Sequence, residues 1–131
     1  MMNDKYKKLY EIALKQRKFS YSPYSHFSVG AALLCTDGTV YTGCNVENSS
    51  FSMTNCAERT AVFKAVSEGY KDFEAIAIAG GKANSEDELC YPCGACLQVL
   101  NEFCGDDFKI ILKDKETALK NLLPCNFTLE K

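Results

Sequence analysis

The sequence is poor in several residue types, and each shortage excludes a class of protein. It has no tryptophan, three prolines and one histidine, His26, so no zinc site of several imidazoles can be built. His26 stands in the loop-like stretch PYSHF, where a loop residue is a better interpretation than a ligand. No apolar run is long enough to span a membrane, and the N-terminal stretch lacks the apolar core of a signal peptide. The net charge of -2, without a strong Lys/Arg cluster, argues against a broad nucleic-acid-binding surface. We therefore expect a cytoplasmic protein with neither a membrane nor a nucleic acid as partner.

Size and composition are those of a compact globular protein. The chain has 131 residues, of which 47% are hydrophobic and 24% charged. A chain of this size builds one hydrophobic core, and no repeat, low-complexity tract or linker interrupts it. We expect a single domain over residues 1–131.

Cysteine, by contrast, is abundant, with eight residues. A disulfide framework is disfavoured in a cytoplasmic chain, where thiols serve as buried packing groups, metal ligands or catalytic groups. Four cysteines stand in contexts that suggest only packing: Cys35, Cys44, Cys104 and Cys125. The other four, Cys56, Cys90, Cys93 and Cys96, occur in the two short motifs NCAER and CYPCGAC.

Hydrophobic periodicity predicts helices alternating with strands. Helices are expected over 4–18, 55–68 and 93–105, with a short helical turn over 116–123. Strands are expected over 28–35, 39–46, 74–81 and 108–114, the first two joined by a hairpin turn at Asp37-Gly38. This alternation favours an α/β fold, a three-layer α-β-α sandwich around a mixed β-sheet of about five strands.

The two cysteine motifs each begin a predicted helix, where free amide groups and the helix dipole favour thiolates. Cys93 and Cys96 form a C-x-x-C pair, and Cys56 would supply a third ligand to one zinc ion. Three protein ligands leave a position open for water, which is typical of catalytic zinc. Glu58 would accept and deliver the proton of that water, and Arg59 would offset the excess negative charge of three thiolates.

Three other interpretations of these cysteines compete. A structural zinc site could use Cys56, Cys90, Cys93 and Cys96. The repeated C-x-x-C could hold an iron–sulfur cluster, and Cys90 with Cys93 could be a thioredoxin-like redox pair. The joint pattern CAE and PCGAC is more specific, because it matches the signature of zinc-dependent nucleobase deaminases with cysteine in place of histidine.

With these motifs the sequence resembles the small homotetrameric cytidine deaminases over nearly its whole length, from about Tyr6 to Phe127. The similar stretches are YSPYSHFSVGAALL, GCNVEN, NCAERTAVFKAVSEGY, PCGAC and LLP. The resemblance implies a cytidine deaminase-like fold, one zinc per subunit, and a homotetramer whose active sites are shared between chains. It also implies a hydrolase acting on a cyclic amidine C–N bond, which deaminates cytidine and deoxycytidine to uridine and deoxyuridine with release of ammonia in pyrimidine salvage.

The resemblance also implies roles for individual residues. Cys56, Cys93 and Cys96 would bind zinc, Glu58 would shuttle protons, and Arg59 would hydrogen-bond ligand sulfurs. Asn45 and Glu47 would bind the ribose hydroxyls. Phe27 would flank the pyrimidine, the Ala57 backbone would meet its carbonyl oxygen, and Phe51 and Phe127 would reach a neighbouring subunit's site. From the residues alone, Asn45 and Glu47 could simply end a strand, Phe27 could be core, and Phe127 could anchor the tail on its own subunit.

A few positions depart from the family pattern. Phe51 stands where tyrosine is common, Leu97 where arginine is frequent, and Cys125 and Asn126 replace smaller residues. Cys90 is an extra thiol near the expected metal. Two rival functions stay open: a deaminase of another cytosine nucleoside, such as a blasticidin-type antibiotic, and a structural zinc-binding module. Glu58 discriminates against the latter, because a structural site needs a fourth ligand and no acid.

Overall fold

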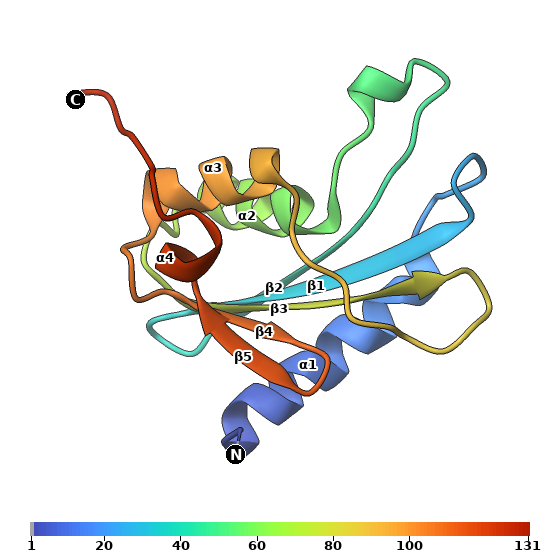
Figure 1. Ribbon diagram of the computed structural model, residues 1–131, viewed down its shortest axis with the longest axis horizontal. Coiled ribbons are helices and arrows are strands. Elements are labelled where there is room, and N and C mark those ends of the chain that lie inside the picture. Colours follow the sequence, from blue (N-terminus) through green and yellow to red (C-terminus); the bar gives the residue numbers. More distant parts are fainter. Residues whose placement is uncertain (1) are drawn as a thin grey trace.

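The computed structural model describes residues 2–131 and shows one five-stranded sheet with helices on both faces (Figure 1). The strands are β1 (Phe27–Cys35), β2 (Val40–Cys44), β3 (Phe73–Lys82), β4 (Lys109–Leu112) and β5 (Lys115–Ala118). The α-helices are α1 (Asp4–Gln16), α2 (Ala57–Ser67), α3 (Gly94–Phe103) and α4 (Leu119–Leu122), and two short 3-10 helices are η1 (Arg17–Phe19) and η2 (Phe51–Met53). The predicted three-layer sandwich is confirmed.

The sheet is mixed, with strand order β2-β1-β3-β4-β5. Only β3 and β4 pair in parallel; the β1–β2, β1–β3 and β4–β5 pairs are antiparallel. A parallel pair needs a crossover connection, and here α3 supplies it. The crossover therefore places α3 over the sheet, beside α2 (Figure 1).

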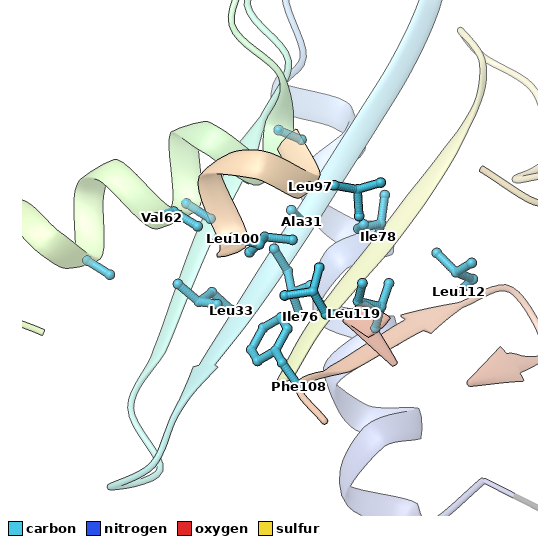
Figure 2. Close-up of a cluster of buried hydrophobic side chains, with 14 residues drawn as sticks. Ala31, Leu33, Val62, Ile76, Ile78, Leu97, Leu100, Phe108, Leu112 and Leu119 are labelled. Carbon is cyan, nitrogen blue, oxygen red and sulfur yellow. The ribbon is translucent and has the colours of Figure 1, made fainter. Parts of the chain in front are cut away.

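Alternation along the central strands separates two layers of core. Leu33, Ile76 and Ile78 face α2 and α3, in the larger cluster drawn in Figure 2. The neighbouring positions Ala32 and Ala77 face α1 on the opposite side. The face toward α1 is built largely from alanines, and Gly30 completes it: a Cβ on Gly30 would lie 2.1 Å from the Ala13 carbonyl oxygen. Small side chains thus let α1 lie close against the sheet.

The predicted elements agree with the structure apart from one strand. The Asp37-Gly38 turn joins β1 and β2, with Gly38 at a φ of +94°. The helical turn expected over 116–123 was partly wrong, because residues 115–118 form β5 and only 119–122 are helical. Asp114, at a φ of 51°, makes the tight turn between β4 and β5. None of the helices described between residues 2 and 131 has the length and apolar character that a membrane crossing needs.

Candidate metal centre

Two helix N-termini bring the sulfur atoms together. Cys56 is the N-cap residue of α2, and Cys93 is the N-cap residue of α3, with Cys96 in the first turn of the same helix. Both helices begin on the same side of the molecule, above the sheet in Figure 1. The positive ends of two helix dipoles therefore act on one group of thiols, which stabilises their ionised forms.

The three sulfurs form a group of the size that a zinc ion needs. Their Sγ atoms all lie within 4.8 Å of one another, and those of Cys93 and Cys96 are 3.5 Å apart. Ligand sulfurs about 2.3 Å from a tetrahedral zinc lie about 3.8 Å from each other. All eight cysteines are free thiols. Cys90 is not part of the group, so the four-cysteine structural site considered above is not formed.

Arg59 provides the positive charge beside these sulfurs. Its Nη2 donates a hydrogen bond to Cys56 Sγ at 3.2 Å. The hydrogen bond with Cys96, and then Arg59, lower the pKa of the Cys56 thiol to about 5 despite its burial, while the bond to Cys56 raises the pKa of Cys96. Leu97 is buried in the core cluster under α2 and α3 and brings no charge to the sulfurs. Arg59 is therefore the charged partner of the sulfur cluster.

Glu58 is a buried acid next to the same cluster, with only 5% of its surface exposed. It lines a pocket of about 170 Å³ together with Cys56 and Cys93. Burial, and then the Cys56 charge, raise the pKa of Glu58 to about 7. A carboxyl group with a pKa near neutrality is suited to both accepting and donating a proton. A larger open hollow of about 710 Å³ lies between α1 and the β4–β5 turn, but no cysteine lines it.

The two residues predicted to bind ribose are buried and heavily hydrogen-bonded within the chain. Asn45 Oδ1 accepts from the Val29 amide at 2.9 Å, and its Nδ2 donates to the Phe27 carbonyl at 2.9 Å. Glu47 accepts hydrogen bonds from the Tyr24 and Ser25 amides and from the Ser25 hydroxyl. Although burial opposes it, hydrogen bonding by Ser25 lowers the pKa of Glu47. Both side chains therefore hold the 20–27 loop.

Each of these two side chains keeps a free hydrogen-bonding position. Asn45 has used one of its two Nδ2 hydrogens, and a carboxylate such as Glu47 accepts about four hydrogen bonds, of which three are made. Asn45 also lines the pocket. Asn45 and Glu47 therefore hold the 20–27 loop in place, and their binding of ribose stays a prediction.

The remaining predicted residues divide between the pocket and the surface. Ala57 is buried and lines the pocket. Phe27 is not among the residues that line the pocket, but its ring lies near the pocket residue Cys90, since a Cβ on Gly80 would meet both Cys90 Sγ at 2.8 Å and Phe27 Cε2 at 3.1 Å. Phe51 and Phe127 are 59% and 65% exposed. The Phe127 carbonyl accepts a hydrogen bond from Asn101 Nδ2 at 3.1 Å, so the main chain of the tail is tied to α3.

Sequence reasoning missed three residues that line the pocket, namely Val29, Thr54 and Tyr91. Thr54 and Tyr91 each stand two positions before a sulfur ligand, which is a signal that could have identified them. Val29 comes from the buried strand β1, and its sequence context gives no such signal. Cys90, identified as an extra thiol near the metal, also lines the pocket, and burial and then Glu58 raise its pKa to about 11.

Comparison with known proteins gives one consistent answer. Residues 3–112 match the family model described as the cytidine and deoxycytidylate deaminase zinc-binding region. A cytidine deaminase of Sporosarcina psychrophila is 50% identical over 128 residues, covering 94% of this chain and 91% of that protein. A cytidine deaminase of Halalkalibacterium halodurans is 47% identical, with 90% of each chain covered.

A solved structure agrees with the sequence relatives. The crystal structure of a cytidine deaminase from Burkholderia pseudomallei is 41% identical and superposes with a TM-score of 0.85, covering 96% of this chain and all of that one. The three clustered cysteines form a group that could hold the metal ion named in the description of this family. The chain therefore belongs to the cytidine and deoxycytidylate deaminase zinc-binding family.

Proposed function

We propose that this chain is a cytidine deaminase, which hydrolyses cytidine and deoxycytidine to uridine and deoxyuridine and releases ammonia, as a step of pyrimidine salvage. The observation that carries this proposal is the buried Glu58 carboxyl in one pocket with the sulfurs of Cys56 and Cys93. A purely structural metal site has no use for a buried acid. The relatives that cover nine-tenths of the chain support the same activity.

The metal centre supplies the electrophilic part of the reaction. Cys56, Cys93 and Cys96 would hold the zinc ion, which when bound would supply Lewis-acid chemistry that makes water a better acid and nucleophile near neutral pH. Arg59 keeps the cluster from becoming too negative by its bond to Cys56 Sγ. Three thiolates alone would weaken that effect, so the guanidinium preserves it.

Glu58 moves the protons. It accepts a proton from the water that attacks carbon 4 of the cytosine ring and delivers a proton to ring nitrogen 3. It then transfers the second water proton to the departing amino group, which leaves as ammonia. Burial raises the pKa of Glu58 to about 7, so this carboxyl can both accept and donate a proton near neutral pH.

The pyrimidine ring would lie in the pocket against the Ala57 backbone, with the Phe27 ring flanking it. Asn45 and Glu47 would use their remaining hydrogen-bonding positions for the ribose hydroxyls. These assignments are supported by the placement of Ala57 and Asn45 in the pocket lining. Hydrogen bonds to the free ribose hydroxyls would favour nucleosides over polynucleotides as substrates.

The assembly would be a homotetramer of single-domain chains, spanning residues 1–131, in the cytoplasm. Its sites would be shared, with Phe51 and Phe127 entering the site of a neighbouring subunit. Two observations support this. Both rings are exposed, and the pocket of about 170 Å³ is smaller than the roughly 300 Å³ at which ligand sites usually begin. A partner chain would complete the part of the pocket that binds the ribose.

The deciding experiment compares Glu58→Gln with Glu68→Gln, which changes an exposed acid at the end of the same helix. Both variants should retain one zinc per chain, and only Glu58→Gln should lose the decrease in cytidine ultraviolet absorbance, by about a thousandfold or more. Normal turnover by Glu58→Gln would remove this residue from the mechanism. Zinc-loaded wild-type protein that leaves cytidine intact would contradict the proposed function. Preferential turnover of a blasticidin-type antibiotic would redirect it.

A further inference from the structure

The loop between β3 and α3 carries part of the metal centre but has little apolar packing of its own. It extends from Lys82 to Cys93, where the ligand Cys93 begins α3, and it also supplies Cys90 and Tyr91 to the pocket. Within residues 82–89 every residue is exposed except Ala83 and Asp87, which are half-buried. The position of this loop must therefore depend on polar contacts.

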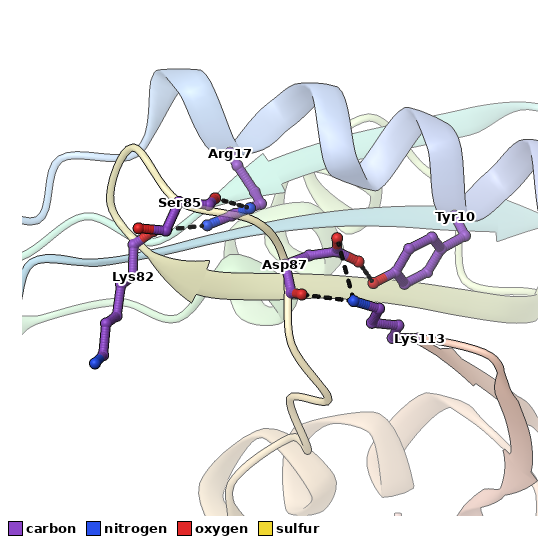
Figure 3. Close-up of polar contacts among 6 residues, drawn as sticks. All are labelled: Tyr10, Arg17, Lys82, Ser85, Asp87 and Lys113. Atoms are coloured by element: carbon purple, nitrogen blue, oxygen red, sulfur yellow. Dashed lines mark hydrogen bonds and ion pairs between the residues drawn. The ribbon is translucent and has the colours of Figure 1, made fainter.

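Asp87 receives two of these contacts from outside the loop (Figure 3). The Tyr10 hydroxyl, on α1, donates to Asp87 Oδ2 at 2.6 Å. Lys113, which follows β4, donates to the Asp87 carbonyl oxygen at 2.8 Å and lies 3.7 Å from Oδ1. Burial and then the bond to Asp87 raise the pKa of Tyr10, so the hydroxyl keeps its proton and remains a donor. Asp87 is thus fixed from two elements, six positions before Cys93.

Arg17 provides a second attachment from the same side of the sheet (Figure 3). Its guanidinium donates to three carbonyl oxygens: Nε to Ser28 at 3.1 Å, Nη1 to Ser85 at 3.2 Å and Nη2 to Lys82 at 3.1 Å. These bonds join the start of the loop to β1. Gly81 permits this close folding, since a Cβ there would lie 2.5 Å from the Glu86 carbonyl oxygen and 2.9 Å from Arg17 Nη2.

The loop then returns to the sheet and turns toward the metal centre. The Glu88 amide donates to the Gly80 carbonyl at 2.7 Å, and Cys90 packs over Gly80. Pro92, which is buried, leads directly to Cys93. With a fixed φ at Pro92 and attachments at Lys82, Ser85 and Asp87, the loop has few ways to place Cys93 other than the observed one.

We infer that Tyr10 and Asp87 are positioning residues for the zinc site, which act through the loop that carries Cys93. Helix α1 lies on the face of the sheet opposite α2 and α3, yet through Asp87 it sets how firmly one of the three ligands is held. This inference rests on the zinc centre of the proposed function and extends it to residues that touch neither metal nor substrate. Displacing a ligand by a fraction of an ångström weakens a metal site even when the ligand itself is intact.

The structure contains a matched control for this idea. Tyr6, also on α1, donates its hydroxyl to Glu74 Oε2 at 3.0 Å, and Glu74 lies near the start of β3, at the opposite end of that strand from the loop. Tyr6→Phe and Tyr10→Phe each remove one hydroxyl that bonds to a carboxylate. A purely structural role predicts similar results for both, whereas a positioning role predicts that only Tyr10→Phe affects the metal.

The experiment measures zinc release from the holoenzyme to a chromogenic chelator, well below the unfolding temperature of each variant. Tyr10→Phe and Asp87→Asn should release zinc on the order of fivefold faster than wild type, and Tyr6→Phe and Glu74→Gln within about twofold. The visible spectrum of the Co²⁺-substituted protein should change only in the first pair. Equal release rates and identical Co²⁺ spectra for Tyr10→Phe and Tyr6→Phe would overturn the inference alone. A wild-type chain that binds no zinc would overturn the metal centre along with it.

Discussion

The two faces of the sheet are packed by different means and serve different ends. The face under α1 is lined by Ala32, Ala75, Ala77 and Ala79, and a single helix covers it. The face under α2 and α3 carries larger side chains such as Leu33 and Ile76, and its helices begin with two of the clustered cysteines. Small residues allow one helix to approach closely, while large ones hold two helices at a distance where their N-termini meet. One face of the sheet therefore allows close packing of a single helix, and the other sets the positions of the two helices that carry the clustered cysteines.

The largest expected effect comes from replacing one of the two cysteines at the ends of α3. Cys93 is the N-cap residue and belongs to the sulfur cluster, whereas Cys104 is the C-cap residue, and burial raises the pKa of Cys104 to about 12. We expect Cys93→Ser to lose zinc and to lower turnover by about a thousandfold or more, while Cys104→Ser keeps both. Zinc analysis and the cytidine absorbance assay measure this. Full zinc occupancy in Cys93→Ser would show that the ligand set is wrong.

Leu9 tests the opposite face. It is 3% exposed and packs in the cluster between α1 and the sheet, so Leu9→Ala should lower the free energy of unfolding by about 2–4 kcal/mol. Turnover per folded molecule and zinc content should stay within about twofold of wild type, because Leu9 packs in the cluster on the α1 face and is not among the residues that line the pocket. Urea unfolding and the activity assay below the transition measure the two quantities. A loss of activity without a loss of stability would contradict the division into two faces.

Arg59 tests how the sulfur cluster is balanced. We expect Arg59→Gln to keep zinc but to reduce turnover about tenfold, because the charge next to Cys56 Sγ disappears. Arg59→Lys retains a charge without the guanidinium geometry, so its turnover should lie between those of wild type and Arg59→Gln. Kinetics over a range of pH on zinc-analysed samples measures this. Unchanged turnover in Arg59→Gln would mean that the helix dipoles alone balance the thiolates.

Glu74 gives the smallest effect and concerns stability against pH. A hydrogen bond from Lys5, and another from Tyr6, lower the pKa of Glu74 below its usual value of 4.5. Since the folded-state pKa is the lower one, the stabilisation is present above about pH 4.5 and is lost as the pH falls through the folded-state pKa. The side chains of Lys5 and Glu74 are 56% and 31% exposed, so solvent screens the pair and Glu74→Gln should cost less than about 1 kcal/mol at pH 7. Urea unfolding from pH 3 to 7 should show the difference vanish at the acid end; a constant difference would contradict this account.

Local patterns predicted most of this fold, and long-range contacts account for what they did not. The helices around Cys56 and Cys93, the Asp37-Gly38 hairpin and the buried strand β3 all follow from periodicity and turn residues. Strand β5 was missed because its sequence, KETA, is short, charged and at the edge of the sheet, where pairing with β4 decides its conformation. The sequence of four residues contains little information about such pairing with another strand.

The candidate site shows the same limit. The clustered cysteines and Glu58 form two compact motifs, so their chemistry could be predicted, and the structure brings the three sulfurs close enough to hold a metal ion. The hydrogen bonds from backbone amides that hold Asn45 and Glu47 come from residues 16 to 23 positions away. Tyr10 and Asp87 are 77 positions apart, and neither has an unusual sequence context. Only the folded chain brings these groups together.

The parallel pairing of β3 with β4 has a consequence for how the protein folds. The β1–β2 hairpin closes locally, but β4 can join the sheet only after the whole crossover segment through α3 has collapsed onto it. Cys93 and Cys96 lie within that segment, whereas Cys56 belongs to the part of the chain made earlier. We therefore expect the metal site to be assembled in the last phase of folding, so that added zinc accelerates refolding little but slows unfolding strongly.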